Sequence, residues 1–281
     1  MNAALPQHAA STAGSATGCR LCGGTLRLQF SQLVLGRHEV QYLVCCACGS
    51  LQTEAPYWLD EAYAQNLSSL DTGAAQRNLR NLAACYAVSR VLGLRQLLDI
   101  GGGDGLLCRL LRDRNINCYV RDKYARPTYA QGFEQPDFEK PELVLAFEVI
   151  EHLPDPAAEL QAFFAESPQA MLISTELYDG QAPDWSYLAP ESGQHVFFYS
   201  RQGLEFIASR RGYTLLLSGE FMLFLKPGSC AAWRVALVKL LLKRRVCRLV
   251  AAWLMLLPTP GVTADHDLQK SRSSFRAGPA A

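Results

Sequence analysis

The sequence predicts an α/β fold, in which a mainly parallel sheet with helices on both faces follows a small metal-binding module. From residue 96 onward, short apolar runs alternate with helix-length segments. This alternation is typical of a parallel sheet that is buried on both faces. Upstream of it, two Cys-x-x-Cys pairs lie close together in the chain. With 281 residues, the chain is long enough for one large domain with appendages.

The composition is that of an ordinary globular protein. Charged residues make up 19% of the chain, and the net charge of +1 gives no reason to expect nucleic-acid binding. Residues 1–18 lack the basic and apolar regions of a signal peptide, so we expect a disordered leader. No apolar run reaches the roughly 18 residues that a membrane span needs. Ten cysteines without a secretion signal indicate a reducing compartment, and we therefore expect a cytoplasmic protein.

The first module, residues 19–51, contains the paired cysteines. Each pair is followed by glycine, which is typical of a tight turn that points two thiolates at one metal ion. Strand-like runs at 25–35 and 39–45 predict a hairpin between the pairs, and four thiolates favour a structural Zn²⁺ ion with no open coordination position. The alternatives are four reduced, buried thiols and a site in which Cys46 replaces one ligand. The expected zinc ligands are Cys19, Cys22, Cys45 and Cys48.

The apolar run 96–100 leads into a glycine cluster and then into a leucine-rich helix. A strand, a tight glycine turn and a helix N-terminus in this order form the first crossover of a Rossmann-like sheet. Glycines let a ligand approach the backbone closely, and the helix N-terminus offers free N–H groups. The dinucleotide fingerprint G-x-G-x-x-G is not met, because Leu106 stands where its third glycine would be. The residues expected to contact the ligand are Asp99, Gly101, Gly103 and Gly105.

A second acidic residue, Asp122, closes the next apolar run, where it would accept hydrogen bonds from both hydroxyls of a ribose. An anionic Asp99 beside the turn favours a cationic ligand over a pyrophosphate. Further on, residues 143–156 read LVLAFEVIEHLPDP. Together these features resemble those of class I S-adenosylmethionine (SAM) methyltransferases. The resemblance implies that SAM is the cofactor and that Phe147 and Glu148 help to bind it. The alternative is a Rossmann-like domain that binds another nucleotide or none.

The rest of the alternation is similar to the sheet of class I methyltransferases. Only residues 219–220 separate the last two runs, which predicts a two-residue hairpin and a final strand that runs antiparallel to the others. By resemblance, helices within 56–94 cover the cofactor, and Tyr63 and Arg77 are candidates to reach it. We assign residues 56–228 to this domain. Strands are expected at 96–100, 117–121, 142–147, 170–175, 213–218 and 221–226, and helices at 104–114, 156–166 and 200–211.

The residue expected to act on the acceptor is His195. It follows a loop after the strand expected at 170–175, at the edge where a ligand should lie, and an imidazole can accept a proton near neutral pH. Segment 193–200 resembles one in methyltransferases that act on sugars, where a histidine and nearby tyrosines serve deprotonation. Packing of His195 among aromatic neighbours is the alternative. Glu151 and His152 are a second candidate pair, and Tyr187 is among the aromatic residues that can line an acceptor pocket.

The whole arrangement resembles bacterial methyltransferases that tailor sugars and polysaccharides. The resemblance implies methyl transfer from SAM to a small polar acceptor, a sugar or glycan, at oxygen or carbon. An RNA methyltransferase with a zinc module for substrate recognition is one alternative. The zinc segment holds only three cationic residues, so nucleic acid is not the expected partner. A non-catalytic SAM-binding protein is the other alternative.

The C-terminal residues 229–269 read as a helical extension. Segment 231–257 is apolar but carries basic residues that spread around the helical wheel. One interpretation is peripheral contact with an anionic membrane at its inner face. A substrate lid and an ordinary pair of docking helices are the other two. Residues 270–281 are expected to be a disordered tail.

Overall fold

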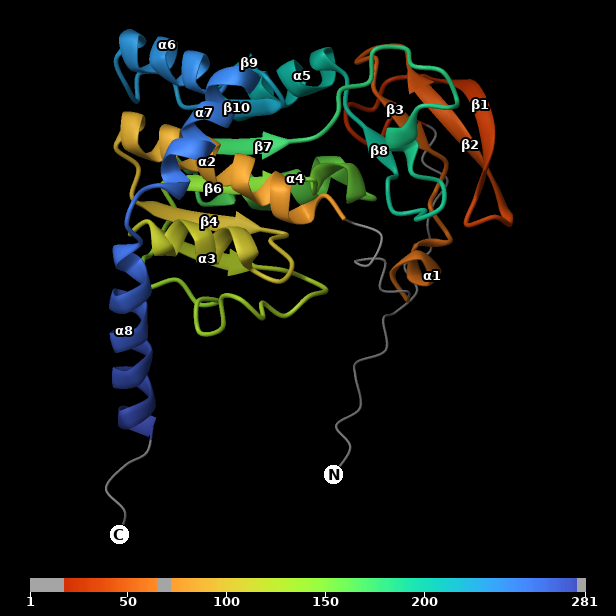
Figure 1. The fold of residues 1–281 in the computed structure, drawn as a ribbon. Coiled ribbons are helices and arrows are strands. Elements are labelled where there is room, and N and C mark those ends of the chain that lie inside the picture. Colours follow the sequence, from red (N-terminus) through yellow and green to blue (C-terminus); the bar gives the residue numbers. More distant parts are fainter. Residues whose placement is uncertain (1–17, 65–71, 277–281) are drawn as a thin grey trace, which may run out of the picture.

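The computed structural model describes residues 18–64 and 72–276, with only the backbone for residues 273–276. A six-stranded sheet with helices on both sides forms the body, and a four-stranded sheet is attached at one end (Figure 1). The predicted leader, up to residue 17, and residues 277–281 of the predicted tail lie outside the described residues. The strands of the body are β4 (Gln96–Ile100), β5 (Asn117–Arg121), β6 (Leu143–Phe147), β7 (Ala170–Ser174), β9 (Thr214–Ser218) and β10 (Phe221–Leu225).

The predicted fold class is confirmed by the pairing of these strands. They lie in the order β5-β4-β6-β7-β10-β9. The pairs β4–β5, β4–β6 and β6–β7 are parallel, whereas β10 runs antiparallel to both of its neighbours. Residues 219–220 form the predicted two-residue hairpin between β9 and β10. The carboxyl ends of β4, β5, β6 and β7 therefore meet at one edge, which is where ligands bind in open α/β sheets.

Both faces of this sheet are covered because its central strands are apolar on both sides. One face carries α2 (Ala74–Leu92) and α3 (Leu106–Asp113), and the other carries α4 (Pro156–Ala165) and α5 (Arg201–Arg211). In β6, Leu143 and Leu145 belong to the first core, whereas Val144 and Ala146 belong to the second. All four are fully buried. Burial of one leucine or valine stabilises the fold by about 1.5–3 kcal/mol.

The N-terminal sheet includes a strand from the body of the protein. Its strands are, in spatial order, β1 (Leu26–Val34), β2 (His38–Cys45), β3 (Leu51–Thr53) and β8 (Phe197–Phe198). The sequence predicted the β1–β2 hairpin but neither β3 nor β8, which are too short to show a periodic pattern. Because β8 follows β7 in the chain, this sheet crosses the boundary that the sequence analysis drew between residues 51 and 56. Pairing with β8 satisfies backbone groups at the edge of β3.

The predicted helical stretch 56–94 contains α1 (Leu59–Ala64) and α2, and residues 65–71 between them lie outside the described residues. Two hydrogen bonds attach the α1 region to the loop that precedes β8. The Trp58 indole donates to the Gly193 carbonyl (2.8 Å), and the Gln194 amide donates to the Ala62 carbonyl (3.0 Å). The short helix therefore supports the loop that carries His195.

Three helices follow β10, namely α6 (Ala232–Leu241), α7 (Arg244–Met255) and α8 (Pro260–Arg276). Helices α6 and α7 pack on α2, and α8 packs on α3. Arg109 and Arg112 of α3 donate to the Asp265 carboxylate of α8 at 2.7–2.8 Å. Because α8 continues to residue 276, the segment 270–276 is helical rather than part of a disordered tail.

Within residues 18–64 and 72–276, no single helix has the length and apolar character to cross a membrane. The pair Arg244–Met255 and Pro260–Arg272 meets the requirement together, by length and composition only, and it is bent by 62°.

Candidate active site

The glycine cluster forms a bend after β4 that larger residues would block. Gly101 and Gly105 have φ values of 71° and 76°, which residues with a side chain rarely adopt. A Cβ atom on Gly101 would lie 2.6 Å from Val149, and one on Gly102 would lie 2.4 Å from the Asp99 carboxylate. Gly105 precedes the first residue of α3. The bend thus presents bare backbone and a helix N-terminus at the ligand edge of the sheet.

Two carboxylates lie beside this bend. Asp99 is only 2% exposed, and its Oδ2 atom has no hydrogen-bond partner among the described residues. Burial, together with the charge of Asp122, raises the pKa of Asp99 to about 8. Asp122 accepts hydrogen bonds from the backbone N–H groups of Gly103 (2.9 Å), Tyr124 (2.8 Å) and Ala125 (2.7 Å).

This arrangement fits a cationic ligand that carries hydroxyl groups. A carboxylate offers about four lone-pair sites, so the three N–H groups leave Asp122 with capacity for a ligand hydroxyl. A positive charge near Asp99 would favour the ionised form of its buried carboxyl group. A cavity of about 700 Å³ beside Asp122 has a volume typical of small-molecule sites. It borders the glycine bend, because Pro127 lines it and also lies against Gly105.

A group of acidic, imidazole and hydroxyl side chains lies at the same edge, where β6 and β7 end. We call Glu148, Glu151, His152, Tyr187 and His195 the acid–histidine cluster. The Tyr187 hydroxyl lies 3.0 Å from Glu148 Oε2 and 2.7 Å from Glu151 Oε1. The rings of His152 and His195 meet edge to face, with centroids 4.8 Å apart. Tertiary folding thus joins the two histidine candidates that the sequence analysis treated separately.

Burial controls the charges in this cluster. Burial raises the pKa of Glu151, and burial together with the charge of Glu151 raises the pKa of Glu148. Burial, with the charge of His195, lowers the pKa of His152 to about 3. His152 is therefore a neutral imidazole at pH 7.

Backbone carbonyls orient both imidazoles. His152 Nδ1 lies 3.1 Å from the Gln194 carbonyl oxygen, and His195 Nδ1 lies 2.6 Å from the Tyr187 carbonyl oxygen. A carbonyl oxygen only accepts hydrogen bonds, so each Nδ1 atom carries a proton. Whenever such a ring is neutral, its Nε2 atom has a free lone pair.

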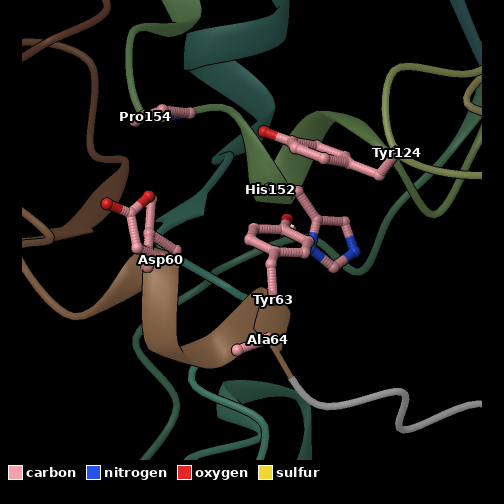
Figure 2. Close-up of a pocket in the computed structure, with 7 residues that line it drawn as sticks. Asp60, Tyr63, Ala64, Tyr124, His152 and Pro154 are labelled. Atoms are coloured by element: carbon pink, nitrogen blue, oxygen red, sulfur yellow. Dashed lines mark hydrogen bonds between the residues drawn. The ribbon is translucent and has the colours of Figure 1, made fainter. Parts of the chain in front are cut away.

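A second cavity, of about 330 Å³, opens beside His152 and α1 (Figure 2). Tyr63 and Tyr124 stack there with ring centroids 4.6 Å apart, and the Tyr63 hydroxyl lies 3.3 Å from His152 Nδ1. Tyr124 follows Asp122 by two residues, so one short segment borders both cavities. The smaller cavity therefore has room for a second ligand next to the cluster.

The segment that leaves β6 links the glycine bend to the acid–histidine cluster. Val149 lies against Gly101, because a Cβ atom added to Gly101 would lie only 2.6 Å from the Val149 side chain. Its neighbour Glu148 has a φ of 53°, which is strained for a residue with a side chain. Ser174 at the end of β7 donates a hydrogen bond of 2.6 Å to the Glu148 carboxylate. Surrounding contacts thus hold an unfavourable backbone conformation where the two parts of the site meet.

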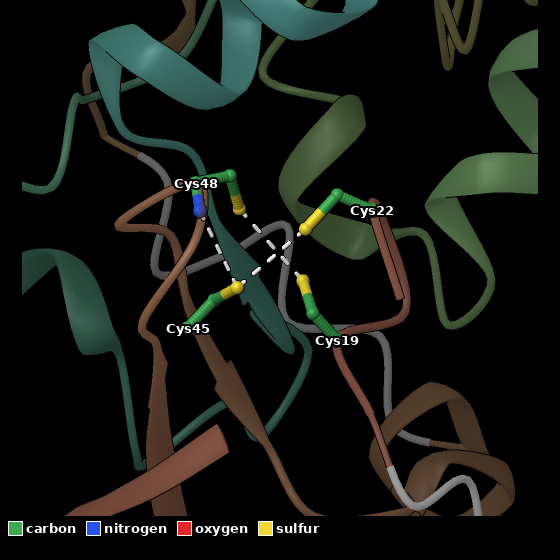
Figure 3. A group of neighbouring side chains, drawn as sticks. All are labelled: Cys19, Cys22, Cys45 and Cys48. Atoms are coloured by element: carbon green, nitrogen blue, oxygen red, sulfur yellow. Dashed lines mark hydrogen bonds between the residues drawn. The ribbon is translucent and has the colours of Figure 1, made fainter. Parts of the chain in front are cut away.

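The four paired cysteines form a compact cluster at the base of the N-terminal sheet (Figure 3). The Sγ atoms of Cys19 and Cys48 lie 3.8 Å apart, and those of Cys22 and Cys45 lie 3.5 Å apart. Four sulfur atoms around a tetrahedral Zn²⁺ ion at about 2.3 Å would be about 3.8 Å apart. Backbone N–H groups of residues 47 and 48 also point at the Cys45 sulfur. The geometry is compatible with zinc.

This cysteine cluster is directly attached to the segment that carries His195. The Arg20 guanidinium donates to the carbonyl oxygens of Thr53 (3.0 Å), Val196 (2.7 Å) and Pro154 (2.9 Å). The Ser200 hydroxyl donates a short hydrogen bond to the Cys48 carbonyl. The cysteine turns therefore hold both the start of β8 and the end of the turn that follows β6.

The predicted site residues are found in two neighbouring groups. Asp99, the glycines and Asp122 surround the bend, and His195 lies in the acid–histidine cluster. Phe147 packs edge to face on Phe221, while the Glu148 carboxylate contacts Ser174 and Tyr187. Contact of Phe147 or Glu148 with a cofactor stays a prediction.

Local sequence patterns did not indicate the contacts of Tyr124 and Ser174, and they did not place Glu148 near the histidines. The spacing Glu-x-x-Glu-His in residues 148–152 was the available signal. A turn directly after β6 brings both carboxylates of that segment to the Tyr187 hydroxyl. No local pattern marks Tyr124 or Ser174, because each contacts a residue that is distant in the chain, Tyr63 and Glu148 respectively.

A family model described as a methyltransferase domain matches residues 59–218. The methyltransferase domain of a bacterial CtHen1 is a structural neighbour, with 19% identity, a TM-score of 0.38, and coverage of 53% of this chain and 98% of that one. Magnesium protoporphyrin IX methyltransferase from Synechocystis PCC 6803, with bound S-adenosylhomocysteine (SAH), has 16% identity, a TM-score of 0.40 and coverage of 60% and 92%. Human N-acetylserotonin methyltransferase in complex with SAM has 14% identity, a TM-score of 0.39 and coverage of 51% and 50%. No curated protein sequence matches the chain significantly.

Proposed function

The chain belongs to the methyltransferase-domain family and is a SAM-dependent methyltransferase, and from this premise we propose that it methylates a hydroxyl group of a small polar acceptor. A sugar or glycan is the acceptor class that we favour. The observation that carries the proposal is the acid–histidine cluster, which lies beside the glycine bend and borders a cavity of its own.

The residues around the bend fit SAM. The cofactor supplies a methyl group that is electrophilic because it is bound to a sulfonium. Asp122 would accept hydrogen bonds from the ribose hydroxyls, and Asp99 would stabilise the positive charge of the ligand. The bare backbone of Gly101 and Gly103 would let the ligand lie against the chain.

The cluster fits an acceptor that is rich in hydroxyl groups. Glu148, Tyr187 and His195 offer several donors and acceptors in a largely buried setting, and the rings of Tyr63 and Tyr124 provide an apolar wall. The free Nε2 atom of His195 would accept the proton of the reacting hydroxyl or orient its oxygen. We assign this role to His195 because its Nδ1–H is already held by a backbone carbonyl.

Incubation with methyl-labelled SAM and fractionated native metabolites and glycans tests the function. We expect the label in a carbohydrate-containing fraction, and mass fragmentation should place it on an oxygen. Label on a carbon would show C-methylation by the same site. Label in RNA or in protein alone would refute the proposed acceptor class. Binding of SAM without transfer to any fraction would refute the enzymatic proposal.

Replacement of Asp122 with alanine should weaken SAM binding by about tenfold to a hundredfold. Hydrogen bonds to a charged group contribute about 1.5–3 kcal/mol each, and the ribose would lose its charged partner. Calorimetric titration with SAM and with SAH measures the effect. Asp104→Ala is the matched control, because Asp104 lies on the same bend but is exposed. Equal affinities for Asp122→Ala and wild type would remove Asp122 from the cofactor site.

We also propose that the cysteine cluster holds a structural Zn²⁺ ion. The sulfur separations of 3.8 and 3.5 Å are close to the tetrahedral value, and four thiolates leave no position for a substrate. In this proposal zinc stabilises the support of β8 rather than taking part in methyl transfer.

The surface of α6 and α7 supports a further proposal, that this region contacts an anionic membrane. Large apolar side chains are exposed there, among them Trp233 (63% exposed), Leu249 (70%) and Leu256 (84%). Exposed basic residues accompany them between Lys239 and Arg248. Apolar side chains beside cations favour adsorption to the interface of an anionic bilayer.

Charge reversal tests this contact. The double substitution Arg244→Glu and Arg245→Glu should weaken binding to phosphatidylserine vesicles at least about tenfold, because each basic residue near the surface contributes about 1 kcal/mol. Vesicle co-sedimentation measures the change. Arg210→Glu, on the exposed side of α5, is the control. If wild-type protein binds neither anionic nor neutral vesicles, the membrane proposal is refuted.

A further inference from the structure

We propose that Glu151, His152 and His195 bind a divalent transition-metal ion such as Mn²⁺, at a site separate from the cysteine cluster. The inference rests on the proposed function, since the ion would hold the acceptor's oxygen at the acid–histidine cluster. It specifies how His195 orients the acceptor, as a metal ligand.

The three side chains already converge on one point. One nitrogen atom from each imidazole and one carboxylate oxygen lie within 4.8 Å of one another. Glu151 is fully buried, and its Oε2 atom has no hydrogen-bond partner among the described residues. An unpartnered buried carboxylate oxygen is costly, and a cation would satisfy it.

Neighbouring groups orient these side chains through hydrogen bonds, as is typical of metal ligands. Metal-binding histidines typically donate their other ring N–H to a backbone carbonyl or carboxylate. Here His152 Nδ1 lies 3.1 Å from the Gln194 carbonyl, and His195 Nδ1 lies 2.6 Å from the Tyr187 carbonyl. The Tyr187 hydroxyl also lies 2.7 Å from Glu151 Oε1. All three candidate ligands therefore have a second group that orients them.

The donor set indicates the class of ion. Two imidazoles and one carboxylate suit first-row divalent ions such as Mn²⁺, Fe²⁺ and Co²⁺, whereas four thiolates select zinc. Three protein ligands leave coordination positions open. A polar acceptor in the 330 Å³ cavity, which His152 lines, would approach them from the His152 side. Neighbouring hydroxyls of a sugar would be suitable oxygen ligands.

The alternative is a network of hydrogen bonds without an ion. In that case the two imidazoles and Glu151 would only position one another and the acceptor. The two cases differ in whether the full-length, zinc-loaded protein binds Mn²⁺ in the absence of SAM and acceptor.

Mn²⁺ titration followed by electron paramagnetic resonance separates them, because bound Mn²⁺ loses the signal of the free ion. We expect about one Mn²⁺ per chain in addition to zinc. The near-isosteric variants Glu151→Gln and His195→Gln should each weaken Mn²⁺ binding at least about tenfold. His266→Gln and Glu39→Gln are matched controls, since both side chains are exposed and far from the cluster in the chain. Circular dichroism and zinc content verify that each variant is folded.

A Co²⁺ titration of the zinc-loaded protein provides an independent readout. The proposed nitrogen and oxygen ligands predict visible d–d bands without the intense sulfur-to-cobalt charge transfer of a thiolate site. The inference is overturned if wild-type protein binds neither ion, or if both glutamine variants bind Mn²⁺ as well as wild type does. Undiminished methyl transfer by protein that retains zinc but has been freed of other metals would overturn it and leave the proposed function intact. Specific Mn²⁺ binding by protein that methylates no acceptor would support the metal site and refute the proposed function.

Discussion

Replacement of His195 with alanine should lower the rate of methyl transfer by about two to four orders of magnitude and leave SAM affinity unchanged. This magnitude is typical for the loss of a positioned group that moves a proton or orients the acceptor. SAM affinity should be unaffected because His195 lies in the acid–histidine cluster, whereas Asp99, Asp122 and the glycines, which we propose contact SAM, lie around the bend after β4. Single-turnover assays with labelled SAM measure the rate, and calorimetry measures the affinity.

His266→Ala is the control for this substitution, because it removes an exposed histidine from α8. A parallel loss of SAM affinity in His195→Ala would show that the two parts of the site are not separate. Normal turnover by His195→Ala would remove this histidine from the mechanism. His195→Gln is a second variant that controls for folding. Glutamine fills more of the space among the aromatic neighbours of β8 than alanine does, so a loss of transfer in both variants would not result from a packing defect.

The second large effect is expected for Cys22→Ser, which should lose zinc and most of the methyl transfer activity. Binding of structural zinc can contribute on the order of 10 kcal/mol to folding. The cysteine turns hold Arg20 and Cys48, whose hydrogen bonds fix the segments on both sides of β8. Loss of the ion should therefore displace His195 as well as destabilise the N-terminal sheet.

Metal analysis, thermal unfolding and transfer assays on the same preparations test this prediction. Cys46→Ser is the matched control, because Cys46 is exposed and lies outside the cluster. If Cys46→Ser loses zinc to the same extent, the assignment of the four ligands is wrong. Freshly reduced wild-type protein without zinc would contradict the proposal altogether.

Most of the main sheet was predictable from the chain alone. Each of its strands lies within one residue of its predicted bounds, because strands buried on both sides appear as short apolar runs. The glycine bend and the β9–β10 hairpin were predictable for a related reason, since both depend on a few adjacent residues. Helix α8 was not fully anticipated. Its contacts with α3 run through Asp265, Arg109 and Arg112, and such an interaction leaves no periodic signal in the sequence.

The sequence by itself determined the parallel sheet, the bend after β4 and the set of four paired cysteines, because these depend on local periodicity and short fixed spacings. Only the tertiary structure decided that residues 197–198 complete the N-terminal sheet. It also decided that His195 meets His152 beside Glu148 and Glu151. The physical reason is that these contacts join side chains from distant segments, and their partners are selected by backbone pairing and burial rather than by neighbouring residues in the chain.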